Sequence, residues 1–168
     1  MENLYKELRS FFANDMDLND LFDSEAIIWI DWREYDEDVV NYFNDMMDEP
    51  IDIQIVSNGK PYGDDIVLKN GNKELQIPYG DEQDRDVTIK YFNDFFKPDY
   101  EVRWFAESLG NDTLGFTVLS GAEWANLEDE FGADTVRYYF EPINLESNMF
   151  NLDMDEVFAL LELRENNR

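Results

Sequence analysis

The stretch from residue 34 to residue 50, EYDEDVVNYFNDMMDEP, most constrains how this chain can fold. It holds seven carboxylates and no Lys, Arg or His, yet it is also rich in apolar residues. The apolar residues recur at helical spacing and form one stripe, Val39, Val40, Phe43, Met46 and Met47. The opposite side of that helix carries Glu37, Asp38, Asn41, Asp45 and Asp48. We predict a helix with Asp36 as its N-cap and Pro50 after its end, one face buried and the other almost wholly carboxylate.

The composition of the chain indicates that this acidic stretch belongs to a folded protein. Apolar residues make up 43% and aromatic residues 15% of the 168 residues, far more than an acidic disordered tail contains. Forty Asp and Glu against thirteen Lys and Arg give a net charge of −27, whereas a magnitude of about 2–8 keeps a small domain soluble. Self-repulsion on this scale destabilises a compact chain, so a function or an environment must favour it.

The absence of two residue types excludes whole classes of site. The chain has neither Cys nor His, which rules out disulfides, thiolate nucleophiles, Cys- or His-ligated metals and His-based catalytic triads. The opening residues lack a signal-peptide pattern, and no apolar run is long enough to span a membrane. We therefore expect a cytoplasmic protein that does not bind membranes.

Periodicity along the rest of the chain predicts alternating helices and strands. Leu4, Leu8, Phe11 and Phe12 mark one face of an opening helix, and the NG dipeptide marks a hairpin within 65–79. Ser120 and Glu123 fit a capping box at the start of a helix that Gly132 would end in the left-handed conformation. Residues 134–143 fit either a helix or a strand. We predict further strands at 26–32, 51–57, 100–108 and 113–120, a helix at 86–98, and a last helix near 153–165 that buries Met154, Val157, Phe158 and Leu161.

These elements indicate an α+β fold. No Pro/Gly/Ser-rich break divides the chain, so residues 1–168 are expected to form one acidic domain. We predict a mostly antiparallel sheet of about five or six strands with about four or five covering helices.

Metal-binding and catalytic patterns are weak. Asp15, Asp17 and Asn19 have the spacing that begins a calcium loop, but Asp20 stands where that loop needs Gly and Ala26 where it needs Glu. The sequence also lacks the phosphate-binding and nucleophile-elbow glycine motifs. A pair of carboxylates could still act as in a glycosidase, although forty acids will always supply some such pair. We expect no metal, no cofactor and no enzymatic activity.

The charge distribution favours a positively charged protein as partner. Residues 15–59 hold fourteen acids and one Arg, and a surface of this kind repels the phosphates of nucleic acids but attracts the proteins that bind them. We predict partner contacts at Glu37, Asp38, Asp45 and Asp48, with the acidic loop Asp81, Glu82 and Asp84 as a second candidate. The same charge pattern also fits a solvated helix face, a halophilic source, or a DNA mimic directed at a restriction or defence enzyme.

Residues 100–143, YEVRWFAESLGNDTLGFTVLSGAEWANLEDEFGADTVRYYFEPI, resemble in arrangement small acidic bacterial proteins. With its size, its acidity and its lack of Cys and His, the chain looks like an immunity protein of bacterial polymorphic toxin systems, including contact-dependent growth inhibition. That resemblance implies tight neutralisation of one cognate toxin domain, often a nuclease, in the cytosol. It carries over no functional residue. We expect the protein to be a monomer rather than an oligomer within such a complex.

Overall fold

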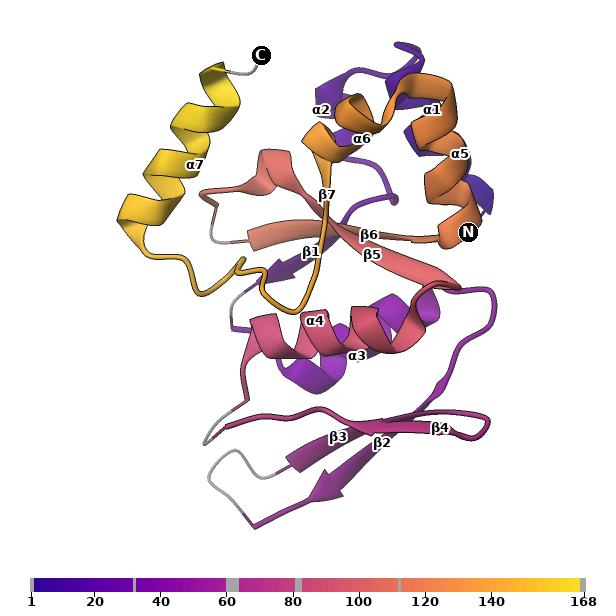
Figure 1. Cartoon of the computed structure of the whole chain (residues 1–168), viewed down its shortest axis with the longest axis vertical. Coiled ribbons are helices and arrows are strands. Elements are labelled where there is room, and N and C mark those ends of the chain that lie inside the picture. Colours follow the sequence, from indigo (N-terminus) through magenta and orange to yellow (C-terminus); the bar gives the residue numbers. More distant parts are fainter. Residues whose placement is uncertain (1, 32, 60–63, 81–82, 112, 167–168) are drawn as a thin grey trace.

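The computed structural model describes residues 2–31, 33–59, 64–80, 83–111 and 113–166, and its elements stack in layers (Figure 1). Four helices of the described residues cover one face of a four-stranded sheet. Two more helices separate its other face from a three-stranded sheet, and a last helix stands at the side of the molecule (Figure 1). The four covering helices are α1 (Glu2–Phe12), α2 (Leu18–Phe22), α5 (Gly121–Phe131) and α6 (Ala133–Tyr139). The two helices between the sheets are α3 (Asp36–Asp45) and α4 (Arg85–Phe96), and the last helix is α7 (Met154–Asn166).

Both sheets are antiparallel throughout. The four-stranded sheet has the order β1-β6-β5-β7, and the three-stranded sheet has the order β2-β3-β4. The strands are β1 (Ile28–Asp31), β2 (Asp52–Ser57), β3 (Asp64–Asn70), β4 (Lys73–Gln76), β5 (Tyr100–Phe105), β6 (Thr113–Ser120) and β7 (Phe140–Pro142). A short 3₁₀ helix, Ala106–Ser108, follows β5.

Two apolar cores hold the layers together. The larger core lies between the two sheets. There the apolar side of α3 packs against α4, and the rings of Phe43 and Phe92 have centroids 5.6 Å apart. The smaller core lies between the four-stranded sheet and the helices above it, around Trp124 and Phe140. The four-stranded sheet is therefore covered on both faces, which explains why the residues of β5 and β6 are almost all buried or half-buried in succession.

Most element predictions are confirmed. The fold is α+β with antiparallel strands, and the described strands divide between two sheets. The hairpin turns at Gly71, whose φ of +61° suits glycine, and the capping box of Ser120 and Glu123 is complete. Gly132 ends α5 with a positive φ of 95°, but its ψ of 133° lies outside the left-handed helical region. The ambiguous residues 134–143 contain both alternatives, the body of α6 followed by β7.

The predicted N-cap of α3 is wrong. Tyr35 holds the N-cap position and makes no capping bond through its side chain, while Asp36 is the first helical residue and is buried. The Asp36 carboxylate instead accepts a hydrogen bond of 3.1 Å from Nε of Arg85 on α4. Nη1 of the same guanidinium donates to the backbone oxygen of Asp31 at 2.9 Å. Burial raises the pKa of Asp36, and Arg85 opposes that rise. The first acid of α3 is therefore a structural link between α3, β1 and α4.

The predicted burial of the last helix is also wrong. Met154, Phe158 and Leu161 on α7 are 71%, 59% and 39% exposed, whereas Val157 and Leu160 pack partly against the larger core. Arg164 joins the helix to the body through Glu107 at 2.7 Å and through the backbone oxygen of Tyr138. An apolar groove of about 310 Å³ remains between the body and the helix.

No helix among the described ranges combines the length and the apolar character needed to cross a membrane.

Candidate partner-binding surface

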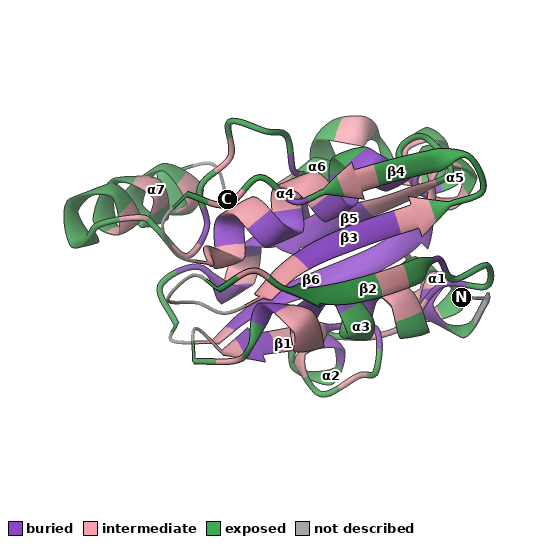
Figure 2. Cartoon of the chain, turned by 90° about the horizontal axis from the view of Figure 1, so that it is seen from below, coloured by how far each residue is buried: buried purple, intermediate pink, exposed green. Residues whose placement is uncertain are grey.

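The acidic segment of the chain forms one side of the molecule. Residues 15–31 and 33–59 comprise α2, β1, α3 and β2, and these elements share one side when the molecule is seen from the end of the three-stranded sheet (Figure 2). We call this surface the acidic side. Its exposed carboxylates are those of Asp15, Asp17, Asp20, Asp23, Glu25, Asp45, Asp48, Glu49 and Asp52.

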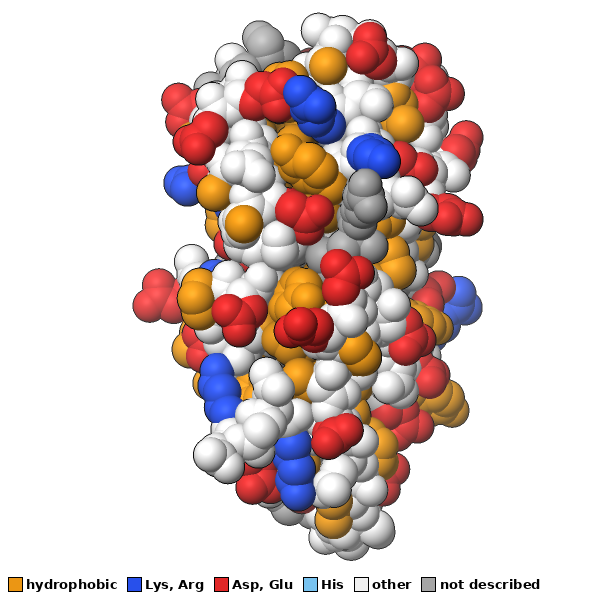
Figure 3. Space-filling view, turned by 90° about the vertical axis from the view of Figure 1, so that its right-hand side faces the viewer, with side chains coloured by type: hydrophobic (Ala, Val, Ile, Leu, Met, Phe, Trp, Pro, Cys, Tyr) orange, Lys and Arg blue, Asp and Glu red, His pale blue; other side chains and the backbone are white. Residues whose placement is uncertain are grey.

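The acidic side differs from the rest of the surface mainly in its lack of cations. Outside residues 15–59 the chain has 26 acids and 12 Lys or Arg, and Figure 3 shows a face where Lys and Arg side chains lie among Asp and Glu from one end to the other. On the acidic side the single Arg33 binds the carboxylate of Asp31 through its Nε and Nη2 at 3.3 and 3.0 Å. An approaching cation therefore meets fewer positively charged side chains here than elsewhere on the surface.

Exposed tyrosines alternate with aspartates along the outer face of α3. Tyr35, Asp38, Tyr42 and Asp45 follow one another at three- and four-residue intervals, the spacing of a single helical stripe. Tyr35 is 70% exposed and Tyr42 is 40% exposed. We call these four residues the tyrosine–aspartate stripe. Tyrosine is one of the residue types that most often anchors protein interfaces, and a tyrosine ring beside a carboxylate can hold an arginine by stacking and by ion pairing.

The Tyr42 hydroxyl donates a hydrogen bond to the carboxylate of Glu34. A hydrogen bond with the Glu34 carboxylate, then burial, then the negative charges of Glu34 and Asp38 raise the pKa of Tyr42 above its ordinary value. The single hydroxyl hydrogen of Tyr42 is thus donated to a carboxylate that can only accept. The stripe therefore offers apolar rings and anions within one helix face.

The predicted contact residues are only partly brought together. Asp45 and Asp48 are exposed near the end of α3, and Glu37 and Asp38 are half-buried in its first turn. Asp81 and Glu82 of the second candidate lie outside the described residues. Asp84 caps α4 by accepting hydrogen bonds from the backbone nitrogens of Asp86 and Val87, and it also binds the side-chain nitrogen of Asn151. The α3 group therefore forms a surface, whereas Asp84 has a structural task.

Sequence reasoning missed the two tyrosines. Their positions contained a signal, since Tyr35 and Tyr42 are seven residues apart and neither belongs to the apolar stripe that points inward. The sequence does not show where the neighbouring elements lie, and those elements could have covered both rings.

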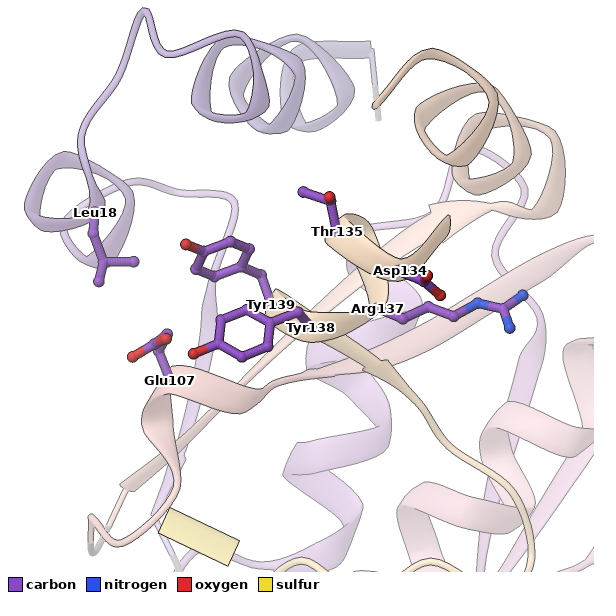
Figure 4. Close-up of a pocket in the computed structure, with 7 residues that line it drawn as sticks. All are labelled: Leu18, Glu107, Asp134, Thr135, Arg137, Tyr138 and Tyr139. Atoms are coloured by element: carbon purple, nitrogen blue, oxygen red, sulfur yellow. The ribbon is translucent and has the colours of Figure 1, made fainter. Parts of the chain in front are cut away.

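A broad hollow of about 1020 Å³ between α6 and α2 is the other candidate for a functional site (Figure 4). The rings of Tyr138 and Tyr139 point into it, while its acids Glu107 and Asp134 lie to either side of the two rings (Figure 4). Glu107 binds Arg164, and Arg137 binds Glu128 at 3.1 Å. Polar groups that converge on one point would mark a catalytic site, but these lie apart or bind structural partners.

The described residues contain no group of three or more Asp and Glu side chains close enough to hold a metal ion. Asp17, which occupies the third position of the calcium-loop pattern, accepts a hydrogen bond of 2.8 Å from the backbone nitrogen of Asp20 and caps α2. The geometry of the acidic side is thus the basis for assigning it a role. Comparisons of the chain with protein-family models, with curated protein sequences and with solved structures found no match.

Proposed function

We propose that this protein is an immunity-type inhibitor that binds a basic toxin domain, with a nuclease as the expected class, in the bacterial cytoplasm. The observation that carries the proposal is the acidic side with its exposed tyrosine–aspartate stripe on α3. The stripe would enter the cationic cleft of the toxin and occupy the place of its substrate's phosphates. Charge would speed the encounter, and the tyrosine rings would supply much of the affinity.

The proposed partner is a protein and not a nucleic acid, because phosphates would be repelled by the side that the protein presents. A monomer of net charge −27 is also unsuited to binding a second copy of itself through the same side, since like charges would meet across the contact. The inhibitor would itself perform no chemistry. Its role would be to exclude the substrate.

The protein is expected to abolish the activity of one basic toxin domain at equal molar amounts. The test is to capture binding proteins from the source cells, purify the basic partner, and measure DNA or RNA cleavage with and without the inhibitor. Inhibition of that partner and of no unrelated nuclease would support the proposal. Inhibition of several unrelated DNA-binding enzymes would indicate a DNA mimic instead, and turnover of any substrate by the protein alone would contradict both.

A further inference from the structure

The four sheet edges of this fold differ in how well they are protected. In the four-stranded sheet, β1 has four residues and β7 has three and ends at Pro142. In the three-stranded sheet, β4 has four residues and carries the charged side chains of Lys73 and Glu74. Short edges, proline and charge are the usual protections against pairing with another chain. The other edge of that sheet, β2, has six residues and no proline, and its single charged side chain is that of Asp52 at its start.

β2 is long, regular and apolar for an edge strand. All six of its residues pair with β3, from Asp52 opposite Lys69 to Ser57 opposite Asp64. No other strand within the described ranges pairs with its outer edge, and the strand has no Lys, Arg or Pro. Ile55 and Val56 are 42% and 46% exposed. Its outer backbone groups are therefore available to another strand.

The two faces of β2 indicate which residue types a strand added at its outer edge would need. Ile53 packs against the larger core, and Ile55 points to the same face because it is two residues further along. Asp52 and Val56 point to the other face, where Val56 stands opposite Asp65. A strand added at this edge would meet Ile53 and Ile55 on its inner face, and on its outer face the Asp52 carboxylate beside Gln54 and Val56, on a chain of net charge −27. Alternating apolar and basic residues would match both.

We propose that β2 accepts a β-strand of alternating apolar and basic residues from the cationic partner, which extends the three-stranded sheet to four strands. This proposal rests on the proposed function, since it names how the same partner is held. The acidic side places β2 beside α3, so that one partner can contact the stripe and the strand together (Figure 2). Pairing of β2 with β2 of a second copy is opposed by the net charge of −27 on each chain.

The test uses a blocked peptide of alternating valine and lysine as the probe, with a peptide of the same composition in which all valines precede all lysines as the control. Backbone hydrogen exchange of the whole protein is measured by NMR with each peptide. The alternating peptide should slow exchange at residues 52–57 by about tenfold when it is near saturation and leave residues 73–76 unchanged. The control peptide should have little effect on either strand.

A pair of variants separates strand addition from simple charge attraction. Ile55→Lys places a cation on the inner face of the β2 edge and should remove the protection, whereas Gln76→Lys adds the same charge at the opposite edge and should leave it intact. Equal protection by both peptides, an unchanged exchange rate in β2, or self-association that protects β2 without peptide would each overturn the proposal. If the captured toxin is inhibited but leaves β2 exchange unchanged, strand addition fails while the inhibitor function stands.

Discussion

Replacing Arg103 with methionine is expected to lower the free energy of unfolding by about 3–5 kcal/mol. Arg103 is buried on β5, and its guanidinium donates to Glu101 at 2.5 Å through Nε and to Glu128 at 2.7 Å through Nη2. The same group stacks over the ring of Trp124 at 4.5 Å. Its removal leaves the mostly buried Glu101 carboxylate without this partner and Glu128 with Arg137 alone, and this loss of compensation is the source of the large effect.

The matched control is Arg9→Met, which breaks an Arg–Glu pair of similar length on the surface. Nη2 of Arg9 lies 2.8 Å from Glu130, but both side chains are about half exposed, so the loss should be far smaller than that of the Arg103→Met variant. Chemical denaturation of both variants measures the comparison. Equal losses would mean that burial does not strengthen the Arg103 pair.

The Arg103 effect should also depend on pH. Burial alone would raise the pKa of Glu128, but the hydrogen bonds and charges of Arg103 and Arg137 outweigh it, so this pKa lies below its ordinary value of 4.5. An acid with a depressed pKa in the folded state stabilises the fold above its unfolded-state pKa and loses that contribution as the pH falls through the lower value. The stability gap between wild type and Arg103→Met should therefore be full above pH 4.5 and shrink below it.

Replacing Asp86 with asparagine is expected to cost about 3–4 kcal/mol and to lower the melting temperature by roughly 10 °C. The buried carboxylate accepts backbone hydrogen bonds from Met149, Phe150 and Asn151 at 3.1, 2.8 and 3.0 Å. An asparagine amide can accept through only one of its two terminal atoms, and its other atom would turn a donor toward a donor. The loop at 149–151 would then lose its attachment to α4.

Asp94→Asn is the control for this substitution, because Asp94 lies on the same helix and is exposed. Its effect should stay within about 0.5 kcal/mol. Thermal unfolding followed by circular dichroism compares the two variants. An Asp86→Asn protein as stable as Asp94→Asn would show that the three backbone bonds contribute little.

Local patterns predicted those parts of the fold that depend on near neighbours in the sequence. The amphipathic stripe of α3, the turn at Gly71 and the capping box at Ser120 each involve residues a few positions apart, so their physical causes are visible in the sequence. The role of Asp36 was not visible in this way. Its partner Arg85 is 49 residues away, and only the folded chain brings the two together.

Periodicity also tells which residues share a face but not what covers that face. Met154 and Phe158 fall on one side of α7 as predicted, yet no described element packs over them. For the candidate site, too, periodicity did not tell which side chains stay uncovered. The sequence placed carboxylates on the outer side of α3, whereas the exposure of Tyr35 and Tyr42 required the position of every neighbouring element.

The association rate with the captured toxin, measured by stopped flow at low and high salt, tests most directly whether the acidic side is the docking surface. Asp38, Asp45 and Asp48 are changed together to lysine. In the control, Asp94, Asp129 and Glu162, which lie on other helices, are changed to lysine, so that the two variants have the same net charge. At low salt the first variant should associate about tenfold more slowly than the control, and the difference should vanish at high salt. Equal slowing of the two variants would contradict the account, because the charge would then act through the whole molecule and not through the acidic side.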